Sequence, residues 1–140
     1  MFRWVRSFLI RRQWLADWQT NDHLLLGRQG EALAARFLRR QGMRILRRNY
    51  SDGNWEIDLI AADGATVVFV EVKTRQNVDF ASPESAVDFH KQERIRAAGQ
   101  HYLKRFRRHE ESPPYRFDIV AIDCSHKNQK PIIKHIRNAF

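Results

Sequence analysis

The feature that most constrains this sequence is an apolar, β-branched run that ends in charges. Residues 66–73 read Thr-Val-Val-Phe-Val-Glu-Val-Lys, and such a run predicts a central strand that is covered on both faces. Side chains two residues apart in a strand point to the same side, so Glu71 and Lys73 project together. Burying charges is costly unless they are paired or bind a metal ion. The presence of two charged residues at the end of a buried strand therefore requires a structural or functional explanation.

The segment before this run supplies a partner strand. Residues 55–60 alternate between apolar and polar types, and Asp63-Gly64 is a hairpin turn signal. A hairpin turning there brings Asp58 within cross-strand reach of Glu71. We therefore expect Asp58, Glu71 and Lys73 to converge on one patch.

Two carboxylates and one ammonium in a single patch suit metal-assisted cleavage of phosphodiester bonds. Mg²⁺ and Mn²⁺ prefer oxygen ligands and use one or two carboxylates together with waters and substrate phosphate. The ion polarises the phosphate and activates water, and a lysine beside it stabilises the charge that develops on the phosphoryl oxygens. The alternative is a plain salt-bridge network in which Glu71 pairs with Lys73 and Asp58 joins them.

The charge balance predicts an anionic partner. The 140 residues carry 25 basic and 16 acidic side chains, a net charge of +9, which favours nucleic acid first and a membrane surface second. Bases concentrate in residues 36–48 and 91–108. Such runs either bind phosphates or form solvated helix faces. The candidate phosphate contacts are Arg39, Arg40, Arg75, Lys91 and Arg94.

The chain divides into a basic, aromatic extension over residues 1–23 and one domain over residues 24–140. The extension suits an amphipathic helix on a membrane or an arm on nucleic acid, and we assign it no function. In the domain, apolar periodicity predicts a helix that stops near Gly42 and a second helix from about residue 91 to 106. Strands are predicted at 46–50, 55–60, 66–73, 115–122 and 132–136, with a turn at 51–54. The fold class is therefore mixed α/β.

Three further features restrict the class of protein. No apolar run is long enough to span a membrane. Cys124 is the single cysteine, which excludes an internal disulfide and fits the reducing cytoplasm. The six histidines show no metal-ligand spacing, and we expect surface or capping roles for them.

Several motifs in this order resemble a known family. They are Gly27-Arg28-Gln29-Gly30-Glu31-Ala32, Asn49-Tyr50, Glu56-Ile57-Asp58-Leu59-Ile60, Phe69-Val70-Glu71-Val72-Lys73-Thr74-Arg75 and Arg116-Phe117-Asp118. Together they resemble the YraN family of uncharacterised bacterial proteins. That family is assigned to the restriction-endonuclease-like fold of the PD-(D/E)xK nucleases, with a core similar to that of archaeal Holliday junction resolvases. The resemblance implies a single domain whose mixed central sheet is flanked by helices.

The resemblance also implies roles for individual residues. Asp58 matches the first metal-binding aspartate, Glu71 the second carboxylate and Lys73 the lysine of the Glu-x-Lys motif. Glu31 matches an additional acid that often completes the metal site through a bound water; alternatively, as a glutamate on a first helical turn, it favours the helix dipole. Trp55 stands where the family usually has glycine.

The expected function is that of a cytoplasmic nuclease that depends on Mg²⁺ or Mn²⁺ and acts on DNA, including branched or recombination intermediates. Cleavage of two strands would favour a homodimer. The runner-up is a non-catalytic nucleic-acid-binding module on a nuclease fold. A third hypothesis is that the chain is a peripheral membrane protein recruited by residues 1–20.

Overall fold

The computed structural model describes residues 22–76, 87–106, 111–126 and 129–140. The predicted N-terminal extension lies, up to residue 21, outside these described residues. The elements are α2 (His23–Arg40), β1 (Arg44–Asp52), β2 (Trp55–Asp63), β3 (Thr66–Arg75), α3 (Phe89–Arg105), β4 (Tyr115–Asp123) and β5 (Ile132–Ile136). Neither of the helices in these ranges is long and apolar enough to cross a membrane.

The five strands form one mixed sheet in the order β1-β2-β3-β4-β5, which makes β3 the central strand as predicted. β3 and β4 are parallel, whereas the other neighbouring pairs are antiparallel. A parallel pair needs a crossover connection, and α3 lies in that crossover. The predicted mixed α/β domain is confirmed, and the arrangement is compatible with a nuclease-like core.

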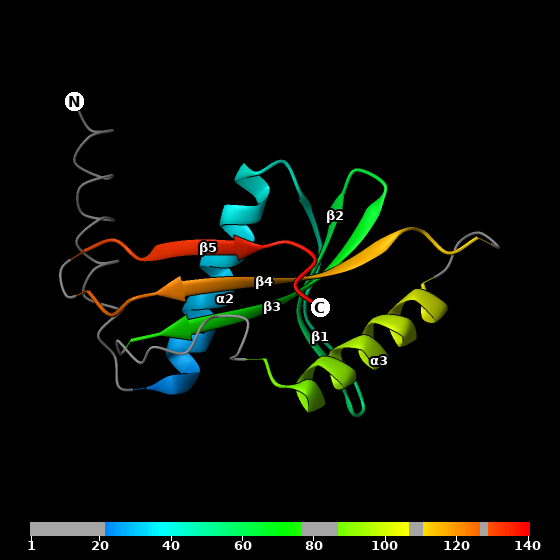
Figure 1. The fold of residues 1–140 in the computed structure, drawn as a ribbon, viewed down its shortest axis with the longest axis horizontal. Helices are drawn as coiled ribbons and strands as arrows, with labels where there is room; N and C mark the ends of the chain where they lie inside the picture. The colour runs from blue at the N-terminus through cyan, green and yellow to red at the C-terminus, as the bar shows by residue number, and fades with distance from the viewer. Residues whose placement is uncertain (1–21, 77–86, 107–110, 127–128) are drawn as a thin grey trace.

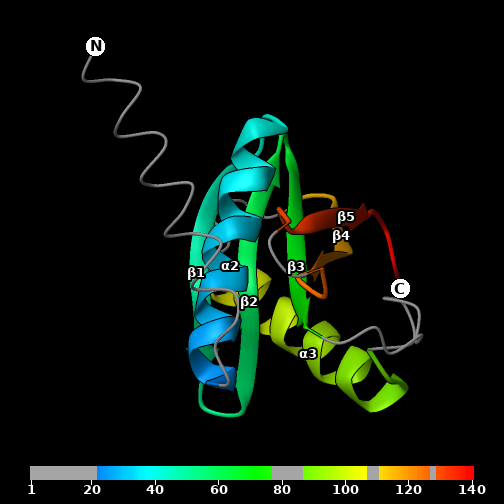
Figure 2. The same ribbon diagram turned by 90° about the vertical axis from the view of Figure 1, so that its left-hand side faces the viewer.

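The two helices cover opposite faces of the sheet (Figures 1 and 2). α2 packs its buried Leu26, Ala34 and Leu38 against residues of β2, β3 and β4 in one apolar cluster. α3 packs its buried Ile95 and Ala98 into a second cluster on the other face. The central strand is therefore covered on both sides, which explains its continuous apolar run.

The first two strands are longer than their sequence pattern suggests. The predicted turn over residues 51–54 is wrong at Ser51 and Asp52, which belong to β1; Asp52 pairs with Trp55. The reversal needs only Gly53 and Asn54, because Gly53 adopts a left-handed φ of 64° that costs glycine little. A long two-stranded ribbon results.

The ribbon bends at Asp58, and the bend positions the candidate site. Ile57 belongs to the apolar cluster under α3, yet Leu59, two residues later, belongs to the cluster under α2. Regular alternation would put both on one face. On the neighbouring strand, Asn49 has a left-handed φ of 48°, which asparagine tolerates better than most residues. β2 therefore turns away from β3 just where Asp58 lies.

Candidate functional site

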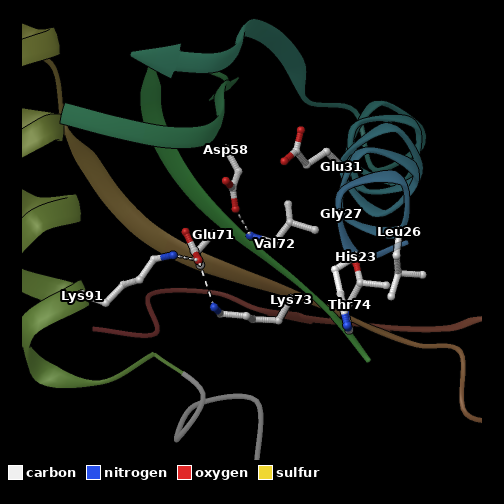
Figure 3. Close-up of a pocket in the computed structure, with 10 residues that line it drawn as sticks. All are labelled: His23, Leu26, Gly27, Glu31, Asp58, Glu71, Val72, Lys73, Thr74 and Lys91. Atoms are coloured by element: carbon white, nitrogen blue, oxygen red, sulfur yellow. Dashed lines mark hydrogen bonds and ion pairs between the residues drawn. The ribbon is translucent and has the colours of Figure 1, made fainter. Parts of the chain in front are cut away.

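A pocket of about 270 Å³ opens where β2 leaves β3. It lies between α2, the distal half of β3 and the first turn of α3 (Figure 3). Its lining residues are His23, Leu26, Gly27, Glu31, Asp58, Glu71, Val72, Lys73, Thr74 and Lys91. The pocket brings together the four residues predicted to carry catalysis, which are Glu31, Asp58, Glu71 and Lys73.

Asp58 is fixed by the backbone of the neighbouring strand. The pairing of β2 with β3 ends at Leu59 and Val70. Beyond that point the backbone N–H of Val72 donates to Oδ2 of Asp58 at 2.8 Å (Figure 3). The carboxylate thus takes a position that a strand carbonyl would occupy in a longer ladder, and the expected hairpin delivers Asp58 to Glu71.

Glu71 is the buried acid at the centre of the pocket, with 4% of its surface exposed. Its Oε1 lies 3.3 Å from Nζ of Lys73 and 2.8 Å from Nζ of Lys91. The pair with Lys73 follows from the period of a strand, since the two residues share a face. Lys91 arrives from α3, on the far side of the pocket from α2 (Figure 3).

The acids of the pocket crowd one another. Burial raises the pKa of Asp58 to about 7, with help from the negative charge of Glu71 and a smaller contribution from Glu31, against the opposing hydrogen bond from Val72. Burial alone would lower the pKa of Lys91, but the hydrogen bond and charge of Glu71 outweigh it and the pKa is raised. The pocket therefore holds one lysine firmly protonated and one carboxyl that gives up its proton reluctantly.

Glu31 reaches the pocket because α2 approaches β3 closely. A side-chain Cβ added at Gly30 would lie 1.9 Å from Oγ1 of Thr74, so only glycine lets the helix lie there. α2 begins at His23, which places Glu31 two turns inside the helix. The alternative role for Glu31, an acid on the first helical turn, is therefore wrong.

The predicted phosphate contacts are distributed unequally around the pocket. Lys91 lies in it, and Arg94, which is exposed, follows one turn later on α3. Arg75 is two residues beyond Lys73 at the end of β3. Arg39 and Arg40 are exposed in the last turn of α2, roughly 13 Å along the helix axis from Glu31. The structure does not bring these two arginines to the pocket.

Glu56 stands apart from the cluster. Its side chain is exposed and does not line the pocket, although its charge still contributes to the raised pKa of Lys91. His23 also lines the pocket, although it was not among the predicted site residues. No motif marks it, because a lone histidine before an apolar stripe carries no spacing signal.

A second charged cluster lies elsewhere in the sheet. Asp118 is fully buried and accepts hydrogen bonds from Nε of Arg116, Nε2 of His135 and the backbone N–H of Asn138, at 2.8 to 3.2 Å. The expectation of surface or capping roles is wrong for His135, whose side chain is 8% exposed. Its position on β5 places it beside β4, a pairing that histidine spacing cannot reveal.

The donor set of the pocket fits a hard cation only in part. Within the described ranges, no three or more His, Cys, Asp or Glu side chains are arranged as a group that could hold a metal ion. Mg²⁺ commonly uses only one or two protein carboxylates and completes its shell with water and phosphate. Asp58 and Glu71 provide such a pair of carboxylates. Glu71 forms ion pairs with Lys73 and Lys91 in this structure.

Comparison with known proteins identifies relatives over the same region. The uncharacterised protein family UPF0102 matches residues 30–122, a range that contains every acid and lysine of the pocket. A UPF0102 protein of Rhodococcus opacus is 48% identical over 118 residues, covering 84% of this chain and 98% of the relative. One from Solibacter usitatus is 45% identical, covering 81% and 84%, and one from Caldicellulosiruptor saccharolyticus is 38% identical, covering 82% and 96%.

Proposed function

This chain belongs to the uncharacterised protein family UPF0102, and from the geometry of its pocket we propose that it is a metal-dependent nuclease that hydrolyses phosphodiester bonds in DNA. One observation carries the proposal. Asp58, Glu71 and Lys73 come from two strands and meet in a single pocket with Glu31 beside them. Crowded acids with a shifted pKa in a cleft are typical of functional sites.

Each residue has a distinct role in this proposal. Asp58 and Glu71 would hold Mg²⁺ or Mn²⁺ through their carboxylate oxygens, and Glu31 would contribute through a bound water. When bound, the metal supplies Lewis-acid polarisation of the phosphate and an activated water. Lys73 places its ammonium beside Glu71, where it can stabilise negative charge on the phosphoryl oxygens.

The basic side chains around the pocket supply affinity for the nucleic-acid backbone. Arg75, Lys91 and Arg94 lie near the pocket, and Arg39 with Arg40 extends the basic surface along α2. Such contacts make binding strongly dependent on salt. We propose DNA as the polymer, branched or recombination intermediates among its substrates, the cytoplasm as the location and a homodimer where two strands are cut.

The test is cleavage of labelled four-way junction, flap and duplex DNA with Mn²⁺. We expect cleavage that stops when the metal is chelated. The Lys73→Ala variant should lower the rate about 100-fold or more, the usual cost of removing a group that stabilises transition-state charge. Its binding to the same DNA in Ca²⁺ should change by no more than about threefold, as expected for the loss of one partly exposed cation.

The control is Lys104→Ala, which removes the same charge from an exposed position in the last turn of α3. This variant should cleave at the wild-type rate. Equal rates in the Lys73→Ala and wild-type proteins would mean that the cleavage does not come from this pocket.

A non-catalytic nucleic-acid-binding module is the second candidate, and two observations favour it. Both lysines already neutralise Glu71, and the acids in the described ranges form no three-membered metal-binding group. Salt-sensitive binding to the whole DNA panel without cleavage in Mn²⁺ or Mg²⁺ would support this candidate over the nuclease.

A further inference from the structure

Glu71 has one more cation than the proposed catalytic arrangement needs. Lys73 follows it on the same strand, and Lys91 reaches it from α3 with the shorter contact, 2.8 Å against 3.3 Å. In Figure 3 both ammonium groups point at the same carboxylate. The second ion pair therefore requires an explanation of its own.

The two partners of this ion pair differ in their access to water. Glu71 is 4% exposed, whereas the side chain of Lys91 is 38% exposed. A buried carboxylate is costly to keep ionised without a counter-ion. A half-exposed lysine can return its ammonium to solvent at small cost, because its flexible stem reaches outward. Glu71 is thus the fixed partner and Lys91 the replaceable one.

Charge balance points the same way. At full ionisation the pocket holds three carboxylates, of Glu31, Asp58 and Glu71, and two ammonium groups, of Lys73 and Lys91. A divalent cation added beside both lysines would leave a net positive pocket. If Lys91 leaves Glu71 as the cation enters, the two remaining positive species balance the three carboxylates.

We propose that Lys91 is the resting counter-ion of Glu71 and competes with the divalent cation for its carboxylate, leaving Glu71 when that cation binds. This inference rests on the proposed function and describes how the same pocket is regulated. In the competition with the metal, Lys91 acts through the carboxylate of Glu71. Released from Glu71, its ammonium lies at the pocket wall, one helical turn before the exposed Arg94, and is available to a phosphate oxygen of the substrate.

The test is the affinity of the full chain for Mn²⁺, measured by titration calorimetry without DNA. Removing the competitor in Lys91→Met should tighten Mn²⁺ binding by about three- to fivefold, the upper part of the range expected for losing one partly exposed ion pair. Lys91→Arg keeps a positive charge on a side chain of similar reach and should bind within about twofold of wild type. Lys104→Met removes the same charge further along α3 and should also stay near wild type.

High ionic strength separates direct competition from a general effect of net charge. Salt screens distant charges much more than a contact between partly buried groups. The difference between Lys91→Met and wild type should therefore persist at high salt. Lys91→Gln gives a second neutral variant of the same position, and thermal melting of each variant without metal establishes that it is folded.

The outcomes distinguish this inference from the proposed function. If wild type binds Mn²⁺ and cleaves DNA, but neither neutral variant binds Mn²⁺ more tightly, the competition is overturned and the nuclease stands. A difference that disappears at high salt also overturns it. If wild type and every variant fail to bind Mn²⁺ without DNA, the competition is overturned. The metal-dependent nuclease is overturned with it only if wild type also fails to cleave the DNA panel in Mn²⁺.

Discussion

Two carboxylates are buried in the described part of this protein, and their surroundings are opposite. Asp118 is held by Arg116, His135 and the backbone N–H of Asn138, all of which are donors. Glu71 faces two partly exposed lysines on one side and the carboxylate of Asp58 on the other. Burial is similar, at 0% and 4% exposure, so burial alone does not separate the two sites.

The direction of the pKa shift distinguishes Asp118 from Asp58, the acid that lies beside Glu71. Burial acts to raise the pKa of Asp118, but the bonds from His135, Asn138 and Arg116 prevail and lower it. At the pocket, burial and the negative charge of Glu71 raise the pKa of Asp58. Surroundings that stabilise a charge are typical of structural acids, and surroundings that repel it are typical of functional sites.

The largest expected effect is on stability at Asp118. Asp118→Asn removes the charge that balances Arg116 and should lower the free energy of unfolding by about 3–5 kcal/mol, the usual cost of breaking a buried pair. Lys73→Met should cost no more than about 1 kcal/mol, since its ammonium is partly exposed. Urea denaturation of both variants measures the difference. A smaller loss in Asp118→Asn than in Lys73→Met would reverse the comparison.

Lowering the pH should reproduce part of the loss of stability that is expected in Asp118→Asn. Its pKa in the folded protein is lowered from the ordinary value of 3.8, so the unfolded chain takes up the proton first. The stabilisation is complete well above pH 3.8 and is lost as the pH falls through the folded pKa. The gap in unfolding free energy between wild type and Asp118→Asn should therefore narrow with acid. A gap that stays constant from pH 6 to about pH 3 would contradict this account.

The next largest effect on stability is expected where α2 approaches β3, at Gly30. Gly30→Ala should destabilise the protein by about 1–3 kcal/mol, the range for overpacking, because the new methyl group meets Thr74. Gly27→Ala is the matched control on the same helix, since an added Cβ there has nothing within 4 Å. It should be neutral or stabilising by up to about 1 kcal/mol. Equal melting temperatures for the two variants would argue against a close approach at Gly30.

The smallest stability effect is expected at Asp58, with the opposite sign. Asp58→Asn removes a repelled charge but keeps an oxygen that can accept the N–H of Val72, so stability should rise by up to about 1 kcal/mol. Any cleavage activity should be lost in the same variant. A clearly lower free energy of unfolding for Asp58→Asn, measured by urea denaturation, would show that Asp58 is a structural acid like Asp118.

Local sequence patterns predicted most of the helices and strands, but they did not predict every strand end or bend. The strand over residues 132–136 and the hairpin at Asp63-Gly64 have the predicted positions. The prediction of a turn at Ser51 was wrong because polar residues also occur in a solvent-exposed ribbon. The bend at Asp58 was missed as well, since a period of two cannot show where a strand changes face.

By itself the sequence determined that Asp58, Glu71 and Lys73 lie on neighbouring strands within reach of one another, whereas the bend at Asp58 was decided by the tertiary structure. Strand period and a tight turn are local properties, and they fix which side chains face each other across a hairpin. Only the tertiary structure decided that Lys91 would join them. Its position depends on α3 docking through Gly99, where an added Cβ would lie 3.1 Å from both Phe69 and Phe117. Periodicity shows that a helix has an apolar face, but the packing of distant side chains selects the surface that this face covers.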